Sequence, residues 1–78
     1  MPRFRFHVYN DDITHDREGK EVPDLAAAVV EAAMSAREIM ADELRLNGEI
    51  TLGHWIEIED EDGELTVLAF RDAVKIRP

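Results

Sequence analysis

Apolar and polar side chains alternate along the first part of the chain. In residues 3–9 the apolar set is Phe4, Phe6 and Val8, and the positions between them are polar or amphipathic. A period of two with aromatic residues predicts a β-strand with one buried face, on which His7 would point outward. The polar residues 10–12 favour a turn, and residues 13–15 form a possible short second strand. Residues 16–19 predict another turn, with Gly19 available for a positive φ.

A helical period follows. Asp24 is suited to cap the first turn, Pro23 discourages an earlier start, and Asn47-Gly48 favours a left-handed ending, so we predict a helix over residues 24–47. Its main apolar stripe consists of Leu25, Ala28, Val29, Ala32, Ala36, Ile39, Met40 and Leu46. Such a stripe is typical of a helix that lies on a sheet.

The helix has two irregular features. It is about 35 Å long, whereas a seven-residue strand spans about 24 Å, so we expect it to overhang the sheet and to place Glu43 beyond the sheet's edge. A second apolar stripe, which includes Val30 and Met34, lies away from the main one. That stripe is consistent with contact to a second copy of the chain. It is equally consistent with a few apolar residues that are simply exposed on the helix surface, which is common in proteins.

Two further strands are predicted over residues 54–59 and 64–70, joined by an acidic turn that ends at Gly63. The last strand is apolar on both faces, although a sheet covered by one helix needs only one apolar face. Val67 on this strand and Trp55 on the preceding one therefore indicate that a partner covers the second face. Residues 71–78 form a basic tail.

These elements predict a single α+β domain over residues 1–78. Its architecture would be a two-layer β(β)αββ arrangement, with one long amphipathic helix packed on a small, mainly antiparallel sheet. The strand order does not follow from the sequence.

The formal charge of the 78 residues is −9, and there is no cysteine. This charge argues against nucleic acid as a partner, since such binding depends on neutralising phosphates. If the first and last strands paired, the basic residues would form one cationic edge; they are Arg3, Arg5, Arg71, Lys75 and Arg77. The opening residues lack the apolar stretch that is typical of a signal peptide, and no apolar run approaches the roughly 20 residues of a membrane span. We expect a cytoplasmic protein with no membrane partner.

The only residues that suggest metal binding or acid–base chemistry are histidines and aspartates near the first strand. The candidate metal ligands are His7, His15, Asp16 and His54. Histidine and carboxylate can complete a metal site, but their spacing matches no tight motif. The acidic turn is no EF-hand, because Ile58 and Ala69 stand where that loop needs ligands. No catalytic residue and no cofactor are predicted.

The chain also resembles a known family. The opening Met1-Pro2-Arg3-Phe4-Arg5-Phe6-His7, the segment from Gly19 to Leu25 with its Pro-Asp-Leu helix start, Ile56-Glu57-Ile58, the acidic turn and Phe70 are similar to short, uncharacterised bacterial proteins that share a domain of unknown function. This resemblance implies a bacterial, cytoplasmic protein and carries over no activity. In size, charge and order of elements the chain is also similar to acidic bacterial antitoxins of the HicB kind.

Two functional hypotheses remain open. The first is a non-enzymatic, acidic interaction module of antitoxin-like or regulatory type, a homodimer that binds a basic protein. Its predicted interaction residues are Asp60, Glu61, Asp62, Val30, Met34, Trp55 and Val67. The alternative is a small metal- or ligand-binding protein, or a hydrolase, that uses His7, His15 and Asp16.

Overall fold

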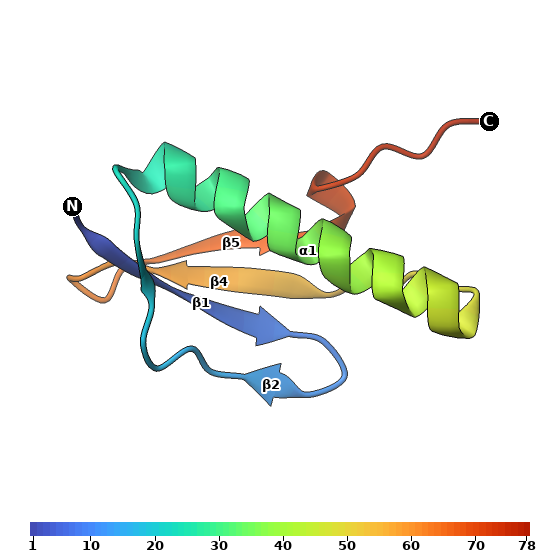
Figure 1. Ribbon diagram of the computed structural model, residues 1–78, viewed down its shortest axis with the longest axis horizontal. Coiled ribbons are helices and arrows are strands. Elements are labelled where there is room, and N and C mark those ends of the chain that lie inside the picture. The colour runs from blue at the N-terminus through green and yellow to red at the C-terminus, as the bar shows by residue number, and fades with distance from the viewer.

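One long helix lies across one face of a small sheet (Figure 1). The computed structural model describes all residues 1–78. Its elements, in chain order, are β1 (Arg3–Tyr9), β2 (Ile13–Thr14), β3 (Lys20–Glu21), α1 (Leu25–Asn47), β4 (Trp55–Glu59), β5 (Leu65–Ala69) and the 3₁₀ helix η1 (Phe70–Asp72). The predicted α+β class, with a long helix on a mainly antiparallel sheet, is confirmed.

The sheet has five strands in the order β2-β1-β4-β5, and β3 pairs with β1 beside β2. All of its pairings are antiparallel. The first and last strands do not pair, because β4 lies between them. Since β1 and β5 then run in the same direction, Arg3 at the start of β1 and Arg71 after the end of β5 lie at opposite ends of the sheet. The cationic edge that such a pairing would have formed is therefore absent.

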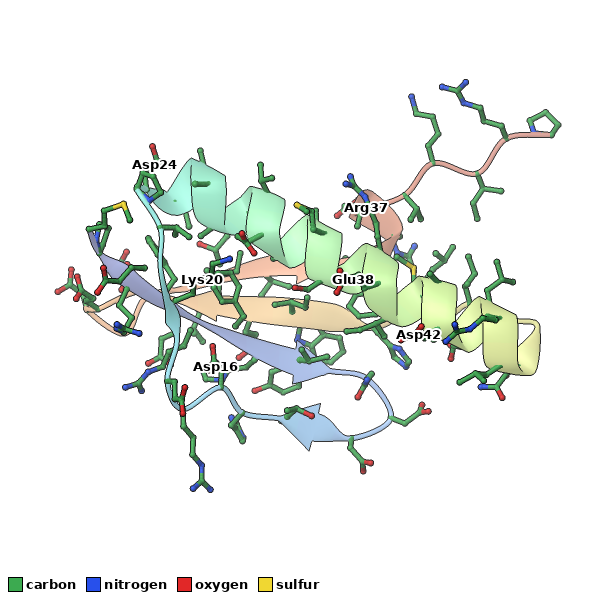
Figure 2. The ribbon with its side chains drawn as sticks, viewed as in Figure 1. Asp16, Lys20, Asp24, Arg37, Glu38 and Asp42 are labelled. Carbon is green, nitrogen blue, oxygen red and sulfur yellow. The ribbon has the colours of Figure 1, made fainter.

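The helix begins and ends at the predicted signals. The Asp24 carboxylate accepts a hydrogen bond from the N–H of Ala27 at 2.8 Å, which satisfies a free donor of the first turn (Figure 2). Gly48 follows the last turn with φ of 72°, and its N–H donates to the carbonyl of Leu44. A left-handed residue at this position is the usual helix ending.

Alanine brings the helix close to the sheet. Ala28, Ala32 and Ala36 are fully buried, and large side chains from the sheet side fill the space below them: Phe4, Ile56, Ile58 and Phe70. Leu25 and Leu46, which the helical period placed on the buried stripe, are instead 46% and 74% exposed. They stand at the two ends of the helix, and its C-terminal end passes beyond the strands in Figure 1. Near that end Glu43 accepts a hydrogen bond from the Thr51 hydroxyl.

Several strand ends differ from the predicted ones by a residue. The last strand was predicted to include Phe70, but the chain turns there into η1, and the Phe70 ring is fully buried against the core. The following residues run back toward the helix, where Arg37 Nε donates to the carbonyl of Ala73 at 2.7 Å (Figure 2). Strand β3, only two residues long, was not predicted.

Gly19 has a conformation and surroundings that exclude a side chain. Its φ is 72°, and a Cβ there would lie 2.6 Å from the carbonyl oxygen of Phe4. Gly48 has the same φ but open space around it. We expect Gly48→Ala to lower the free energy of unfolding by about 1 kcal/mol, from left-handed strain alone, and Gly19→Ala to lower it by about 2–3 kcal/mol. Urea unfolding of both variants measures the difference, and equal losses would contradict the predicted backbone clash.

Candidate functional site

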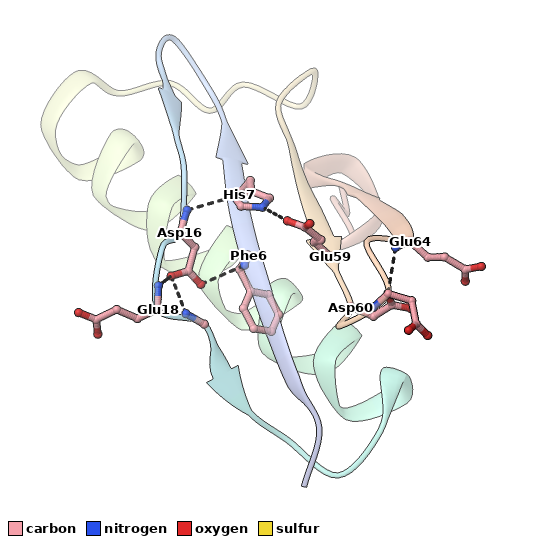
Figure 3. Close-up of polar contacts among 9 residues, drawn as sticks. Phe6, His7, Asp16, Glu18, Glu59, Asp60 and Glu64 are labelled. Atoms are coloured by element: carbon pink, nitrogen blue, oxygen red, sulfur yellow. Dashed lines mark hydrogen bonds and ion pairs between the residues drawn. The ribbon is translucent and has the colours of Figure 1, made fainter.

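The sheet has one face that no element covers, opposite the helix. We call it the open face; its strand residues are Arg3, Arg5, His7, Tyr9, Ile13, Trp55, Glu57, Glu59, Leu65, Val67 and Ala69. Alternation along each strand turns these side chains away from the helix. Figure 3 views this face with the helix behind it.

Asp16 organises the chain beside the open face. Its Oδ1 accepts hydrogen bonds from the N–H groups of Glu18 and Gly19, and its Oδ2 accepts one from the N–H of Phe6 (Figure 3). The N–H of Phe6 lies in the part of β1 that pairs with neither β2 nor β3. The Asp16 carboxylate therefore supplies the acceptor that a neighbouring strand would otherwise provide. Burial by itself raises the pKa of Asp16, but these backbone donors and the nearby His7 outweigh it and hold the pKa below its usual value.

His7 lies at the centre of the open face and is only 8% exposed. Its Nδ1 accepts a hydrogen bond from the N–H of Asp16 at 3.0 Å, so the ring hydrogen is on Nε2, which donates to Glu59 at 2.8 Å. The ring of His15 packs edge-on against it, with 5.3 Å between centroids. His7 points away from the helix, as predicted for this position on the strand, but its ring is buried and not exposed to solvent. Residues 15 and 16 lie beside β1 and contact the His7 ring, which helps to bury it.

The predicted metal ligands do not form a metal site, although His7, His15 and Asp16 lie close together. No group of three or more histidine and carboxylate side chains is arranged to hold a metal ion. Both ring nitrogens of His7 and both oxygens of Asp16 are engaged in the contacts above. His54 precedes Trp55 and therefore lies on the opposite face of the sheet from His7, where it packs against Phe70 and lies 3.6 Å from the exposed Asp11. The arrangement of these four residues therefore does not support the alternative of a metal-dependent protein.

An aromatic pair occupies one end of the open face. The rings of Tyr9 and Trp55 are stacked at 5.0 Å and nearly parallel, and Ile13 pairs with Tyr9 on the next strand. A hydrogen bond to Glu57 raises the pKa of Tyr9. Burial of the hydroxyl and the negative charge of Glu57 raise this pKa further. The hydroxyl therefore stays protonated and can donate a hydrogen bond.

The other end of the open face is charged. A hollow of about 280 Å³ is lined there by Arg3, Arg5, Glu59, Asp60 and Glu61. The guanidinium of Arg3 is held by the carbonyls of Glu18 and Gly19 and by the carboxylate of Glu21. No hydrogen bond or ion pair holds Arg5.

The acidic turn, residues 60–63, borders this hollow, and its three acids differ in role. Asp60 accepts hydrogen bonds from the N–H groups of Asp62 and Glu64, both at 2.9 Å, so its carboxylate shapes the turn (Figure 3). The side chains of Glu61 and Asp62 make no hydrogen bond and are exposed. They are the acids of the turn that no contact within the chain holds.

The predicted interaction residues fall on two different surfaces. Trp55 and Val67 lie on the open face, whereas Val30 and Met34 lie on the helix. The alternation of apolar residues in the strands led to the prediction of Trp55 and Val67, and the second apolar stripe of the helix led to that of Val30 and Met34. Tyr9, Ile13 and Arg5 were not among the predicted residues, because only the strand register brings Tyr9 and Ile13 beside Trp55, and Arg5 beside Glu59 at the other end of the face.

These features define a class: a small α+β domain with one face of its sheet packed under a helix and the other left open. Residues 3–71 match the family described as "Domain of unknown function (DUF6894)", and the chain belongs to this family. The resemblance seen in the sequence is thereby confirmed. No match is found among curated proteins or among solved structures. None of the helices combines the length and the apolar composition that a membrane crossing requires.

Proposed function

We propose that this protein is a non-enzymatic interaction module of the cytoplasm that binds a basic protein through the open face. One observation carries the proposal: the open face combines exposed apolar and aromatic side chains with carboxylates. Ile13, Trp55 and Val67 are exposed on it, and Glu61 and Asp62 are exposed in the adjoining turn. Aromatic and aliphatic anchors beside complementary charge are what protein interfaces use.

The charges favour a basic partner. The chain carries −9 in total, and its unpaired acids adjoin the open face at Glu61 and Asp62. Complementary charge speeds the encounter and is screened by salt, so binding should weaken at high ionic strength. In this proposal Arg5, the one unpaired cation of the hollow, contacts an acidic group of the partner.

The test is affinity capture from lysate with two matched variants. Ile13 on the open face is 56% exposed and Leu44 on the helix is 55% exposed, so Ile13→Glu and Leu44→Glu make the same charge change at equal exposure. We expect one basic protein to be captured in stoichiometric amount by the wild type and by Leu44→Glu, and to be lost with Ile13→Glu. Raising the salt concentration should release it.

The purified partner then allows a direct measurement. Trp55 is the only tryptophan and lies on the open face, so binding should shift its fluorescence to shorter wavelength. The double variant Glu61→Gln/Asp62→Asn should weaken binding about tenfold and leave the turn intact, because Asp60 is unchanged. Equal capture by Ile13→Glu, or affinity indifferent to salt and to these two acids, would sink the proposal.

A further inference from the structure

Strand β5 is a free edge of the sheet. The strand order ends with it, and no other strand pairs with its outer side. The N–H of Phe70 donates to the carbonyl of His54 across the β4–β5 ladder, which sets the alternation of hydrogen bonds between these strands. The residues whose backbone N–H and C=O groups point outward are therefore Leu65, Val67 and Ala69.

The two edges of the sheet are protected to different degrees. At the opposite edge, β2 and β3 have two residues each, and the turn around Asp16 separates them, so little continuous backbone is free to pair. β5 has five residues, Leu-Thr-Val-Leu-Ala, without charge, proline or glycine. Natural sheets commonly block a free edge with such residues or with a bulge. An edge without any of these devices is suited to pairing with another strand.

We propose that β5 pairs antiparallel with β5 of a second copy of this chain, about a two-fold axis at Val67. Val67 then faces Val67 of the second copy, and Leu65 faces Ala69. Each of these pairs exchanges both backbone hydrogen bonds, because the same residues point their N–H and C=O outward. Their side chains all lie on the open face, so the exposed apolar stripe of each copy meets its counterpart.

Charges at the two ends of β5 fit a second copy. Glu64 precedes the strand and Arg71 follows it by two residues, and neither side chain has an ion-pair partner within the chain. In Figure 3 the Glu64 carboxylate extends away from the acidic turn and from Glu59. The two-fold axis places Glu64 of each copy beside Arg71 of the other. The Glu64–Arg71 ion pair therefore forms twice in such a dimer. A strand from an unrelated protein would not in general carry the charges that form these ion pairs.

Sedimentation velocity of the purified protein over a range of concentrations tests the pairing. We expect a concentration-dependent dimer, and a dissociation constant raised about tenfold by Glu64→Arg and by Arg71→Glu separately. The double variant should restore the wild-type constant, because both pairs then re-form with reversed charges. This rescue does not depend on any change in folding.

Two further variants locate the interface. Val67→Pro removes an N–H that points outward and leaves the β4–β5 ladder intact, so it should yield a folded monomer by circular dichroism. Met34→Glu, on the exposed stripe of the helix, should leave the dimer unchanged. A wild-type monomer at all concentrations, no rescue in the double variant, or dissociation by Met34→Glu would each overturn the proposal. Only this protein is present, so the outcome is independent of the binding of a basic partner.

Discussion

Asp16→Ala is expected to lower the free energy of unfolding by about 2–4 kcal/mol, an unusually large effect for a half-buried loop residue. The variant removes the acceptor of three backbone N–H groups, those of Phe6, Glu18 and Gly19. Hydrogen bonds to a charged group contribute about 1.5–3 kcal/mol each. In the variant, those of the three N–H groups that water can reach regain part of this energy by bonding to water. Urea denaturation followed by circular dichroism measures the loss.

Asp16→Asn should separate the two halves of this network. An asparagine oxygen in the place of Oδ1 can still accept from Glu18 and Gly19, so the turn is kept. Its amide group would face the N–H of Phe6, donor against donor, and that bond is lost. We therefore expect Asp16→Asn to lose about half as much stability as Asp16→Ala. Asp12→Ala is the control, because Asp12 is exposed and its side chain makes no hydrogen bond.

The contribution of Asp16 should depend on pH in one direction. Because its pKa is lower in the folded chain than the value of about 3.9 in an unfolded chain, its ionised form stabilises the fold above that value. This stabilisation is lost as the pH falls through the lower, folded pKa. The difference in stability between wild type and Asp16→Ala should be constant from pH 7 to about 5 and shrink below about pH 4. A difference that grows on acidification, or a loss no larger than that of Asp12→Ala, would contradict the role assigned to Asp16.

The elements with strong periodicity could be predicted, because their signals are local. Alternation over residues 3–9 is confirmed as β1, and the cap at Asp24 and the ending at Gly48 are confirmed as the limits of α1. β3 could not be predicted, since two polar residues show no period. Strand order depends on contacts between distant segments, so it also lay outside what a local pattern can indicate.

The open face was predicted only in outline. The two-sided apolar pattern of β5 and the lone Trp55 indicated an uncovered face, which the structure has. The burial of His7 could not be predicted, because residues 15 and 16, which help to bury it, belong to another segment of the chain. In the same way, nothing local distinguishes Asp60, which shapes its turn, from its exposed neighbours Glu61 and Asp62.

Phe70→Ala is expected to cost about 3–5 kcal/mol, the largest effect of any single truncation considered. The Phe70 ring is fully buried. It packs edge-on against the His54 ring, with 5.6 Å between the ring centroids. The helix above presents alanines, which are too short to move into the space that the ring would leave. The cavity would therefore stay open, which adds to the lost burial of the ring.

This loss is large relative to the total stability of so small a domain. At about 0.05–0.15 kcal/mol per residue, a chain of this length has about 4–12 kcal/mol in all, so Phe70→Ala should remove about a quarter of the total stability or more. Phe70→Leu should lose less, and Leu46→Ala, at an exposed site, should lose under about 0.5 kcal/mol. Thermal unfolding followed by circular dichroism ranks the three variants. A loss below about 1 kcal/mol for Phe70→Ala would mean that the core can collapse around the cavity.

The position of Phe70 also links the core to both proposed surfaces. Its N–H closes the β4–β5 ladder at His54, while its ring holds the chain that leaves β5 under the helix. Loss of the ring should therefore loosen β5 and the open face together, and with them any dimer and any partner binding. Ile13→Glu and the exchange of Glu64 and Arg71 change only exposed side chains, so with the core intact each alters one surface. If Phe70→Ala dimerised as the wild type does, the free edge of β5 would not depend on this packing.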